Sequence, residues 1–191
     1  MSAELTGKKV AILVADGFEE SELSEPKKAF EKVGAKTFIV SPKDGEVKGW
    51  SGADWGNKFT VDIPLTKASP EDFDALLLPG GVKNPDTLRI DQDAITFIKG
   101  FVDSGKPIAA ICHGPWTLIE ADGVRGRKMT SWPSIRTDLE NAGAEWVDEE
   151  VIVDNGLVTS RKPDDIPAFV KKAIEEISEG VHPRRDSAPY R

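Results

Sequence analysis

The sequence predicts an α/β fold, with a mostly parallel β-sheet and helices on both of its faces. Several short runs are apolar on both sides, which is typical of strands in a sheet covered on both faces. Segments with the apolar spacing of helices lie between them. Because strands alternate with helices, we expect right-handed crossovers and a mostly parallel sheet. The expected strands cover 8–16, 36–41, 73–81 and 106–112.

The first helix is predicted by an apolar stripe over 23–33, which ends at Gly34 as a C-cap. Pro26 lies inside this stretch and leaves two possibilities. It is either the first-turn proline of a helix that starts near Ser24, or it kinks a longer helix. The first possibility leaves 18–22 as a separate turn.

The clearest helix covers 91–105, where apolar residues line one face and Asp91 or Asp93 can cap the start. The Asp154-Asn155-Gly156 turn predicts a hairpin between two short strands. Three further helices are expected at 115–123, 133–143 and 163–180, the last starting near Ile166 or Pro167, and the short strands at 144–147, 151–154 and 157–161.

The segment 44–66 interrupts this alternation of strands and helices. It is rich in glycine, contains Trp50 and Trp55, and is expected to form a small β excursion. It is either a surface hairpin or a subunit contact, since two tryptophans are costly to leave exposed. We expect a single domain over 1–180, followed by a polar tail over 181–191.

Composition excludes several classes of function. A chain of 191 residues with a net charge of −8 suits one globular domain. This charge disfavours nucleic acids and anionic membrane surfaces as partners, and no apolar run approaches the ~20 residues of a membrane span. One cysteine excludes an internal disulfide, and with two histidines it is poor material for a zinc site. We therefore expect a cytoplasmic protein with no metal and no cofactor.

Cys112 stands at the junction between the strand 106–112 and the next helix. The carboxyl ends of parallel strands are where ligands bind, and a helix N-terminus favours a thiolate. The junction resembles a nucleophile elbow, flanked by the small residues Ala110 and Gly114. Such a turn holds its nucleophile at a backbone strain of about 1–3 kcal/mol. The alternative is an inert cysteine that fills the core.

Two other segments are expected to reach the same edge of the sheet. Gly80 and Gly81 end a strand, and their amides could form an oxyanion hole with the amide of His113. By themselves they also suit an ordinary turn.

The second segment, 15–23, offers the carboxylates Glu19, Glu20 and Glu22. A carboxyl close to a thiolate has a raised pKa and can move protons. The residues themselves do not choose among the three.

Several motifs together resemble the DJ-1/PfpI family over residues 8–177. They are "ADGFEESEL", "FDALLLPGG", "AICHGP" with "RGRKMTSWP", and "NAGAEWVDEEVIVDNGLVTSR". A histidine directly after the cysteine is similar to the PfpI-like general stress protein branch. The resemblance implies a flavodoxin-like sandwich that assembles as a homodimer or a larger homo-oligomer.

The resemblance also implies roles for individual residues. Cys112 is the nucleophile, His113 pairs with its thiol, and Glu19 is the acid. In the PfpI branch a carboxylate from a neighbouring subunit orients the histidine, and Asp86 matches it here. Archaeal members carry the longer glutamate at that position, so the reach of Asp86 is shorter. Glu22 matches a family carboxylate with a supporting role.

The implied activity is glutathione-independent glyoxalase or deglycase chemistry on aldehydes or glycated proteins. The Cys112 thiolate attacks an aldehyde, and the amides of Gly81 and His113 hold the resulting oxyanion. Glu19 or His113 then moves a proton through an enediol, so that methylglyoxal becomes lactate.

Three other functions are weighed against this one. A cysteine peptidase would use His113 as base and Asp86 as orienter. A non-enzymatic oxidation sensor or chaperone would convert Cys112 to a sulfinic acid that Glu19 stabilises. A glutamine amidotransferase needs a late His-x-Glu pair, and His182 is followed by proline and arginine, which excludes it.

Overall fold

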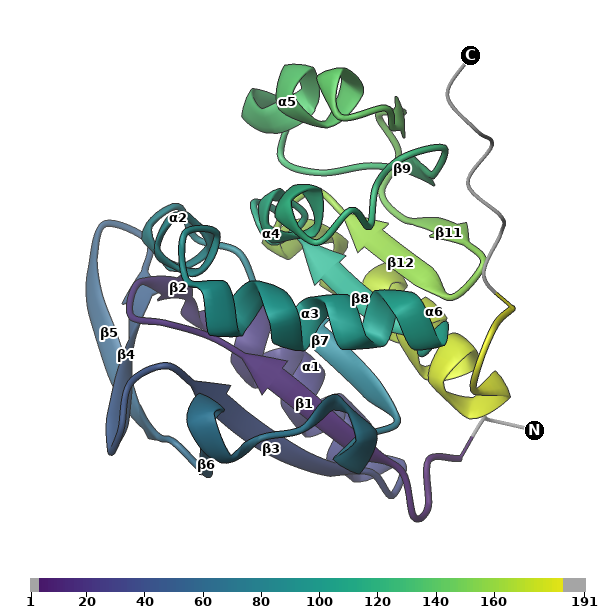
Figure 1. Cartoon of the computed structure of the whole chain (residues 1–191). Coiled ribbons are helices and arrows are strands. Elements are labelled where there is room, and N and C mark those ends of the chain that lie inside the picture. Colours follow the sequence, from purple (N-terminus) through teal and green to yellow (C-terminus); the bar gives the residue numbers. More distant parts are fainter. Residues whose placement is uncertain (1–3, 184–191) are drawn as a thin grey trace.

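The predicted α/β fold is confirmed by the structure, a computed structural model that describes residues 4–183. Its main sheet has seven strands in the order β11-β12-β8-β7-β1-β3-β6 (Figure 1). Every neighbouring pair is parallel except β11 and β12. The strands are β1 (Lys9–Leu13), β3 (Lys36–Ser41), β6 (Ile63–Pro64), β7 (Ala75–Leu78), β8 (Ile108–Ile111), β11 (Ile152–Asp154) and β12 (Leu157–Ser160).

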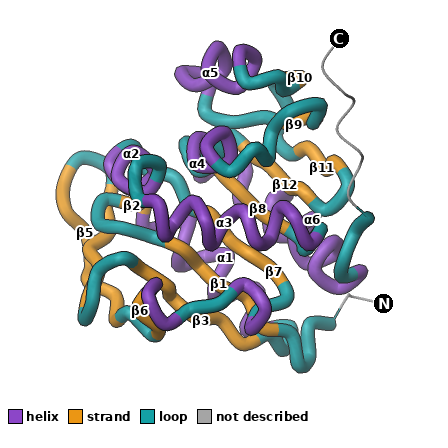
Figure 2. Tube along the Cα trace, viewed as in Figure 1, coloured by secondary structure: helices purple, strands orange, loops and turns teal. Residues whose placement is uncertain are grey.

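Helices cover both faces of this sheet (Figure 2). Alternate residues of β1 point to opposite faces, so Val10 and Ile12 join one apolar core while Ala11 and Leu13 join the other. The first core lies under α1 (Glu20–Lys32) and α6 (Ile166–Glu179), and the second under α3 (Gln92–Ser104), α4 (Trp116–Glu120) and α5 (Arg136–Asn141). This two-sided burial explains why the strands are apolar throughout.

Helix α1 begins at Glu20 and contains Pro26 in its interior, so the shorter helix starting near Ser24 is wrong. Pro26 has no N–H to donate to the carbonyl of Glu22, four residues earlier. The side chains of Leu23, Pro26 and Phe30 are all buried, which offsets this lost bond. The longer helix carries Glu22 in its first turn, on the buried face.

Caps and turns agree with the sequence elsewhere. Asp91 caps α3, where its Oδ1 accepts from the amide of Ala94 at 3.0 Å, and Gly105 ends the helix in the left-handed conformation. Asn155 and Gly156 both have positive φ in the predicted hairpin between β11 and β12. The sequence did not predict α2 (Lys83–Leu88), β2 (Phe18–Glu19) or β9 (Lys128–Met129), the last of which pairs with β10 (Glu145–Trp146).

The segment 44–66 contains a hairpin of β4 (Glu46–Ser51) and β5 (Asp54–Thr60), to which β2 adds a third strand. The hairpin stands beside the main sheet next to α2 and β2 (Figure 1). Trp50 and Trp55 pack edge to face across it, with ring centroids 5.5 Å apart. Its role as a subunit contact stays a prediction.

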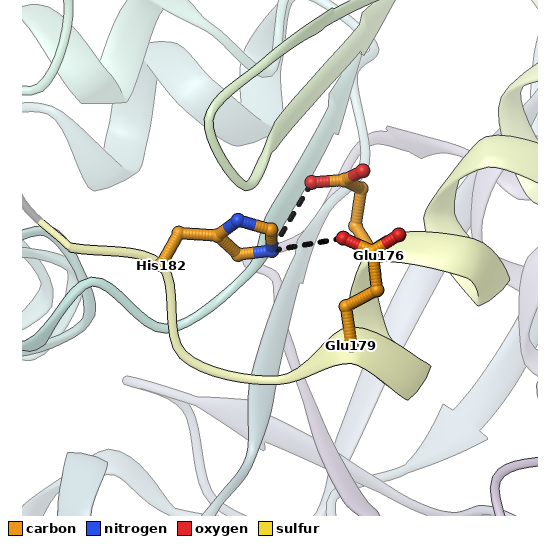
Figure 3. A group of neighbouring side chains, drawn as sticks. All are labelled: Glu176, Glu179 and His182. Carbon is orange, nitrogen blue, oxygen red and sulfur yellow. Dashed lines mark ion pairs between the residues drawn. The ribbon is translucent and has the colours of Figure 1, made fainter.

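The chain after α6 is held against the body of the domain. The amide of His182 donates to the carbonyl of Gly105 at 2.8 Å. Its ring lies 3.2 Å from Glu176 and 3.9 Å from Glu179 (Figure 3). Most of the predicted tail, 184–191, lies outside the described residues. Within the described part, none of the helices combines the length and the apolar character needed to cross a bilayer.

Candidate functional site

A cavity of about 730 Å³ opens where β1, β7 and β8 end. This is the edge of an open α/β sheet at which ligands generally bind. Three tryptophans, several carboxylates and the chain's one cysteine share its wall. The lining residues are Gly17, Glu19, Glu22, Trp50, Gly52, Trp55, Gly81, Val82, Lys83, Asp86, Cys112, His113, Trp132 and Pro163.

Cys112 occupies the strained turn that the sequence predicts. It directly follows β8 and has a φ of +62°, a conformation that side-chain-bearing residues rarely adopt. Two backbone bonds hold it there, since its amide donates to Ser160 at 3.0 Å and its carbonyl accepts from Trp132 at 2.9 Å. The fixed backbone presents the sulfur at the floor of the cavity.

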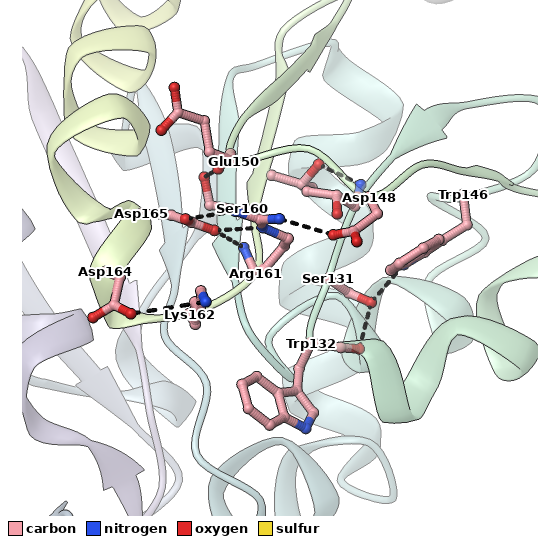
Figure 4. Close-up of polar contacts among 12 residues, drawn as sticks. Ser131, Trp132, Trp146, Asp148, Glu150, Ser160, Arg161, Lys162, Asp164 and Asp165 are labelled. Carbon is pink, nitrogen blue, oxygen red and sulfur yellow. Dashed lines mark hydrogen bonds and ion pairs between the residues drawn. The ribbon is translucent and has the colours of Figure 1, made fainter.

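The end of β12, which supplies the Ser160 carbonyl, is itself anchored by an ion-pair network (Figure 4). Arg161 Nε lies 2.9 Å from Asp165 Oδ2, and its Nη1 lies 2.8 Å from Asp148 Oδ1. The Ser160 hydroxyl donates to the carbonyl of Glu150. These contacts fix the strand neighbouring the nucleophile.

Two backbone amides face the sulfur. Burial and the charge of Glu22 raise the pKa of the Cys112 thiol, and the amides of His113 and Gly81, which donate to the sulfur, oppose part of this rise. Gly81 has a φ of +72°, and a Cβ there would lie 2.3 Å from the carbonyl oxygen of Gly17. Only glycine lets this amide approach the thiol.

The amide of Gly80 has a different partner from the one expected. It donates to Glu22 Oε2 at 2.8 Å, which leaves it unavailable as an oxyanion donor. The expected helix dipole also contributes little, because α4 starts four residues after Cys112 and has five residues. The individual amides of His113 and Gly81 therefore act on the sulfur.

Glu22 is the carboxyl that interacts with the Cys112 thiol. Its side chain is fully buried, and burial, together with the charge of Glu19, raises its pKa to about 8. No N–H group of the described chain donates to its second oxygen, Oε1, so this oxygen can carry the proton of the neutral acid.

The other two glutamates lie elsewhere. Glu19 is half-buried and lines the cavity, and burial raises its pKa as well, but the structure gives it no contact with the sulfur. Glu20 accepts from the amide of Asn57 at 2.8 Å and holds the hairpin. Glu22 is thus the glutamate that contacts the thiol, and the expected role of Glu19 as the acid stays a prediction.

His113 lies between the thiol and a hydroxyl. Its Nδ1 is 3.3 Å from Cys112 Sγ, and its Nε2 is 3.2 Å from Ser134 Oγ. Burial lowers the pKa of His113, so the ring is neutral near pH 7. The expected proximity of His113 and the thiol is present.

Asp86 lines the same cavity from α2 but is exposed and makes no contact with His113 within the chain. Its action across a subunit interface stays a prediction.

Sequence reasoning did not single out Ser134 or Trp132 as parts of this site. Both lie in "TSWPSI", which offers no ligand spacing or periodic pattern. Trp132 stacks near His113, with centroids 6.3 Å apart and ring planes 25° apart. This turn reaches the cavity only through the packing of the folded chain, in which the amide of Trp132 bonds to the carbonyl of Cys112.

Outside this cavity, residues 4–183 include one set of side chains with metal-ligand spacing. Glu176, Glu179 and His182 place one ligand atom each within 4.8 Å of one another (Figure 3). The cavity above Cys112 has no such set.

Comparisons with known proteins agree with this architecture. The model of the DJ-1/PfpI family matches residues 8–176. Protein/nucleic acid deglycase 2 of Escherichia coli is 48% identical over 169 residues, which cover 87% of this chain and 96% of that protein. General stress protein 18 of Bacillus subtilis is 47% identical over 170 residues, covering 88% of this chain and 96% of that protein.

Solved structures show the same fold. A two-domain protein of Anabaena variabilis, with DJ-1/ThiJ/PfpI-like and ferritin-like domains, has a TM-score of 0.84 at 33% identity. The match covers 95% of this chain and 52% of that protein, so the chain spans about half of its length. DJ-1 of Schizosaccharomyces pombe has a TM-score of 0.77 at 28% identity, covering 88% and 90% of the two chains.

Proposed function

The chain belongs to the DJ-1/PfpI family, and on that premise we propose that it is a cysteine-dependent deglycase. Its proposed substrates are early adducts of reactive dicarbonyls with amines and thiols, and free methylglyoxal. The observation that carries this proposal is the buried pair of Glu22 and Cys112 beneath a cavity with two amides aimed at the sulfur. The names of the Escherichia coli and Bacillus subtilis relatives support deglycation and a stress role.

The pair of Glu22 and Cys112 supplies the nucleophile. Burial makes two charges costly here, because it raises the pKa of Glu22 to about 8 and that of Cys112 far above its ordinary value, so the pair holds one proton over a wide pH range. When one proton remains, it can lie on Glu22 while the sulfur is a thiolate. The amides of His113 and Gly81 favour this arrangement because they donate to the sulfur.

The reaction begins with attack of the thiolate on the aldehyde carbon. A C–S bond forms, the carbonyl π electrons move to oxygen, and the amides of Gly81 and His113 stabilise that oxyanion. Glu22 donates its proton to the oxygen, which gives a neutral hemithioacetal and a carboxylate.

Glu22 or His113 then removes the proton from the carbon that bears sulfur. The resulting enediol is reprotonated at the adjacent carbon, which gives a thioester of lactate. Water cleaves the C–S bond and returns the thiol. The sum is methylglyoxal plus water giving lactic acid. An early adduct, a hemiaminal or hemithioacetal, enters the same path when its hydroxyl proton passes to the leaving amine or thiol. The C–N or C–S bond then breaks, the C=O bond forms, and the free aldehyde is released.

The size of the cavity favours adducts over free methylglyoxal as the principal substrate. A volume of about 730 Å³ lies in the range of sites for drug-sized ligands, well above what a three-carbon aldehyde fills. The net charge of −8 favours protein or small-molecule adducts over nucleic acid. A site in the cytoplasm, where dicarbonyls arise from metabolism, belongs to the same proposal.

Release of lactate from methylglyoxal-treated N-acetylcysteine or N-acetyllysine tests this function. We expect turnover by the wild type and a rate at background for Cys112→Ser. Equal release by both proteins would refute deglycation through Cys112. An internally quenched peptide serves as a second arm, because cleavage of the peptide without lactate release would point to a peptidase instead.

A peroxide arm separates catalysis from oxidation sensing. The protein is treated with peroxide and its intact mass is measured. If every Cys112 gains two oxygens while lactate release stays at background, the protein is an oxidation sensor rather than an enzyme.

A further inference from the structure

Ser134 places its hydroxyl on the side of His113 that faces away from the sulfur. It belongs to a single turn of 3₁₀-helix, Pro133–Ile135, that precedes α5. The Ser134 Oγ lies 3.2 Å from His113 Nε2, and the residue is exposed. Thiol, imidazole and hydroxyl thus form a continuous chain from the buried nucleophile to the surface.

The turn that carries Ser134 is held in register with the nucleophile. The amide of Trp132 donates to the carbonyl of Cys112 at 2.9 Å. Ser131 clamps the same turn, because its hydroxyl donates to the carbonyl of Trp132 and accepts from Trp146 Nε1, both at 2.9 Å (Figure 4). Ser134 is therefore fixed relative to the sulfur by three bonds in which its own side chain takes no part.

A neutral imidazole carries one proton, so the partners of its two nitrogens decide where that proton lies. For Nδ1 to accept the Cys112 thiol proton, Nε2 must carry its own proton and donate it. Ser134 Oγ is an acceptor at the right distance. A hydroxyl both accepts and donates, so it can also pass a proton onward to water.

We propose that Ser134 positions His113 and connects its Nε2 to solvent, so that the Cys112 proton leaves through the imidazole and the serine hydroxyl. This inference rests on the proposed function, since it concerns the same thiol. The thiol proton moves to Nδ1, the Nε2 proton moves to Ser134 Oγ, and the hydroxyl gives its own proton to water. The products are a thiolate, a neutral imidazole protonated at Nδ1, and a hydrated proton.

Ser134 gives His113 a partner inside one chain. Asp86, which family resemblance assigned to this role, lines the cavity without contacting the ring. The ionisable groups that share the cavity with His113 are Cys112, Glu19, Glu22, Lys83 and Asp86. Of these, the thiol of Cys112 contacts the imidazole within the described chain.

The rate of Cys112 alkylation by iodoacetamide, measured from pH 5 to 10 by intact mass, tests the proposal. Ser134→Ala removes the acceptor, Ser134→Thr keeps a hydroxyl, and Thr137→Ala removes an exposed hydroxyl from the adjacent helix as a control. We expect Ser134→Ala to lower the rate at pH 7 about five-fold and to raise the pH midpoint by about 0.7, which corresponds to one hydrogen bond of ~1 kcal/mol. Ser134→Thr and Thr137→Ala should retain the wild-type profile.

If the pH midpoint of Cys112 alkylation is unchanged in Ser134→Ala, the proposal is wrong. It is also wrong if Thr137→Ala lowers the alkylation rate as much as Ser134→Ala does and also lowers the melting temperature. Lactate release gives a second readout, in which Ser134→Ala should lower kcat with little change in KM. Alkylation needs no substrate. If the wild type fails to turn over adducts but Ser134→Ala shows the expected shift in the pH midpoint of alkylation, the deglycase proposal is refuted while the role of Ser134 is supported.

Discussion

Replacing Glu22 with glutamine should make the protein more stable and inactive at once. The substitution keeps the shape of the side chain, and the amide can still accept from Gly80 and donate to the sulfur. It removes the ionisable proton. The two effects have separate causes, so they can be measured separately.

The expected gain in stability follows from the pKa of Glu22, which folding raises from 4.5 to about 8. Between those pH values the native chain binds a proton that the unfolded chain has lost, so the free energy of unfolding falls as the pH rises through this window. At pH 7, about 2.5 pH units above the ordinary value, the native state is destabilised by about 3 kcal/mol. Glutamine is free of this cost.

Urea denaturation at pH 4.5 and at pH 7 measures this difference. Glu22→Gln should exceed the wild type by about 3 kcal/mol at pH 7 and by little at pH 4.5. Glu19→Gln is the matched control, because Glu19 is half-buried and should give a smaller difference. The same difference at both pH values would refute the reasoning, since it would show that ionisation is not its cause.

Lactate release measures the second effect. Loss of the residue that moves the proton should lower kcat by about 10²–10⁴ in Glu22→Gln, whereas Glu19→Gln should retain most activity. If Glu19→Gln is inactive and Glu22→Gln keeps its rate, the acid is Glu19, as the family resemblance suggested.

Two further substitutions test how the site is held. Gly81→Ala should lower lactate release and destabilise the fold by about 1–3 kcal/mol, because its Cβ would lie 2.3 Å from the carbonyl oxygen of Gly17 at a φ of +72°; wild-type activity and melting temperature would contradict this. Arg161→Ala should cost about 3–5 kcal/mol in urea denaturation, because it leaves the buried Asp165 without its ion pair, whereas a change below 1 kcal/mol would show that the network is dispensable.

Much of the fold was predictable because the local signals agree with the tertiary structure. The apolar runs over 36–41 and 106–112 contain strands β3 and β8, which pair with β1 and β7 in the main sheet. Gly105 ends α3 as expected. The start of α1 was not settled by local rules, because a proline inside a helix usually marks a boundary. Burial of Leu23 and Phe30 outweighed that preference.

The contact between Glu22 and the thiol could not be predicted because the start of α1 was uncertain. Once the helix extends to Glu20, position 22 falls on the same face as positions 23, 26 and 30, which are buried. Glu20 is two residues away and points elsewhere. Which glutamate faces the buried side of α1 therefore depends on the residue at which the helix begins.

Two other features of the site arise only from packing. The amide of Gly80 could not be assigned to Glu22 before the carboxyl was placed beneath it. Ser134 reaches His113 across 21 residues of sequence, by way of a turn that has no ligand spacing or periodic pattern.

Catalysis through Cys112 requires that Glu22 and Cys112 share one proton, so that a thiolate forms in the pH range of metabolism. The absorbance of the thiolate near 240 nm measures this directly, as the difference between the wild type and Cys112→Ser during a titration from pH 5 to 11. We predict that this absorbance appears within the titrated range, because the amides of His113 and Gly81 favour the thiolate and Glu22 can hold the remaining proton. A sulfur that stays protonated throughout this range, while the protein remains folded, would contradict the account.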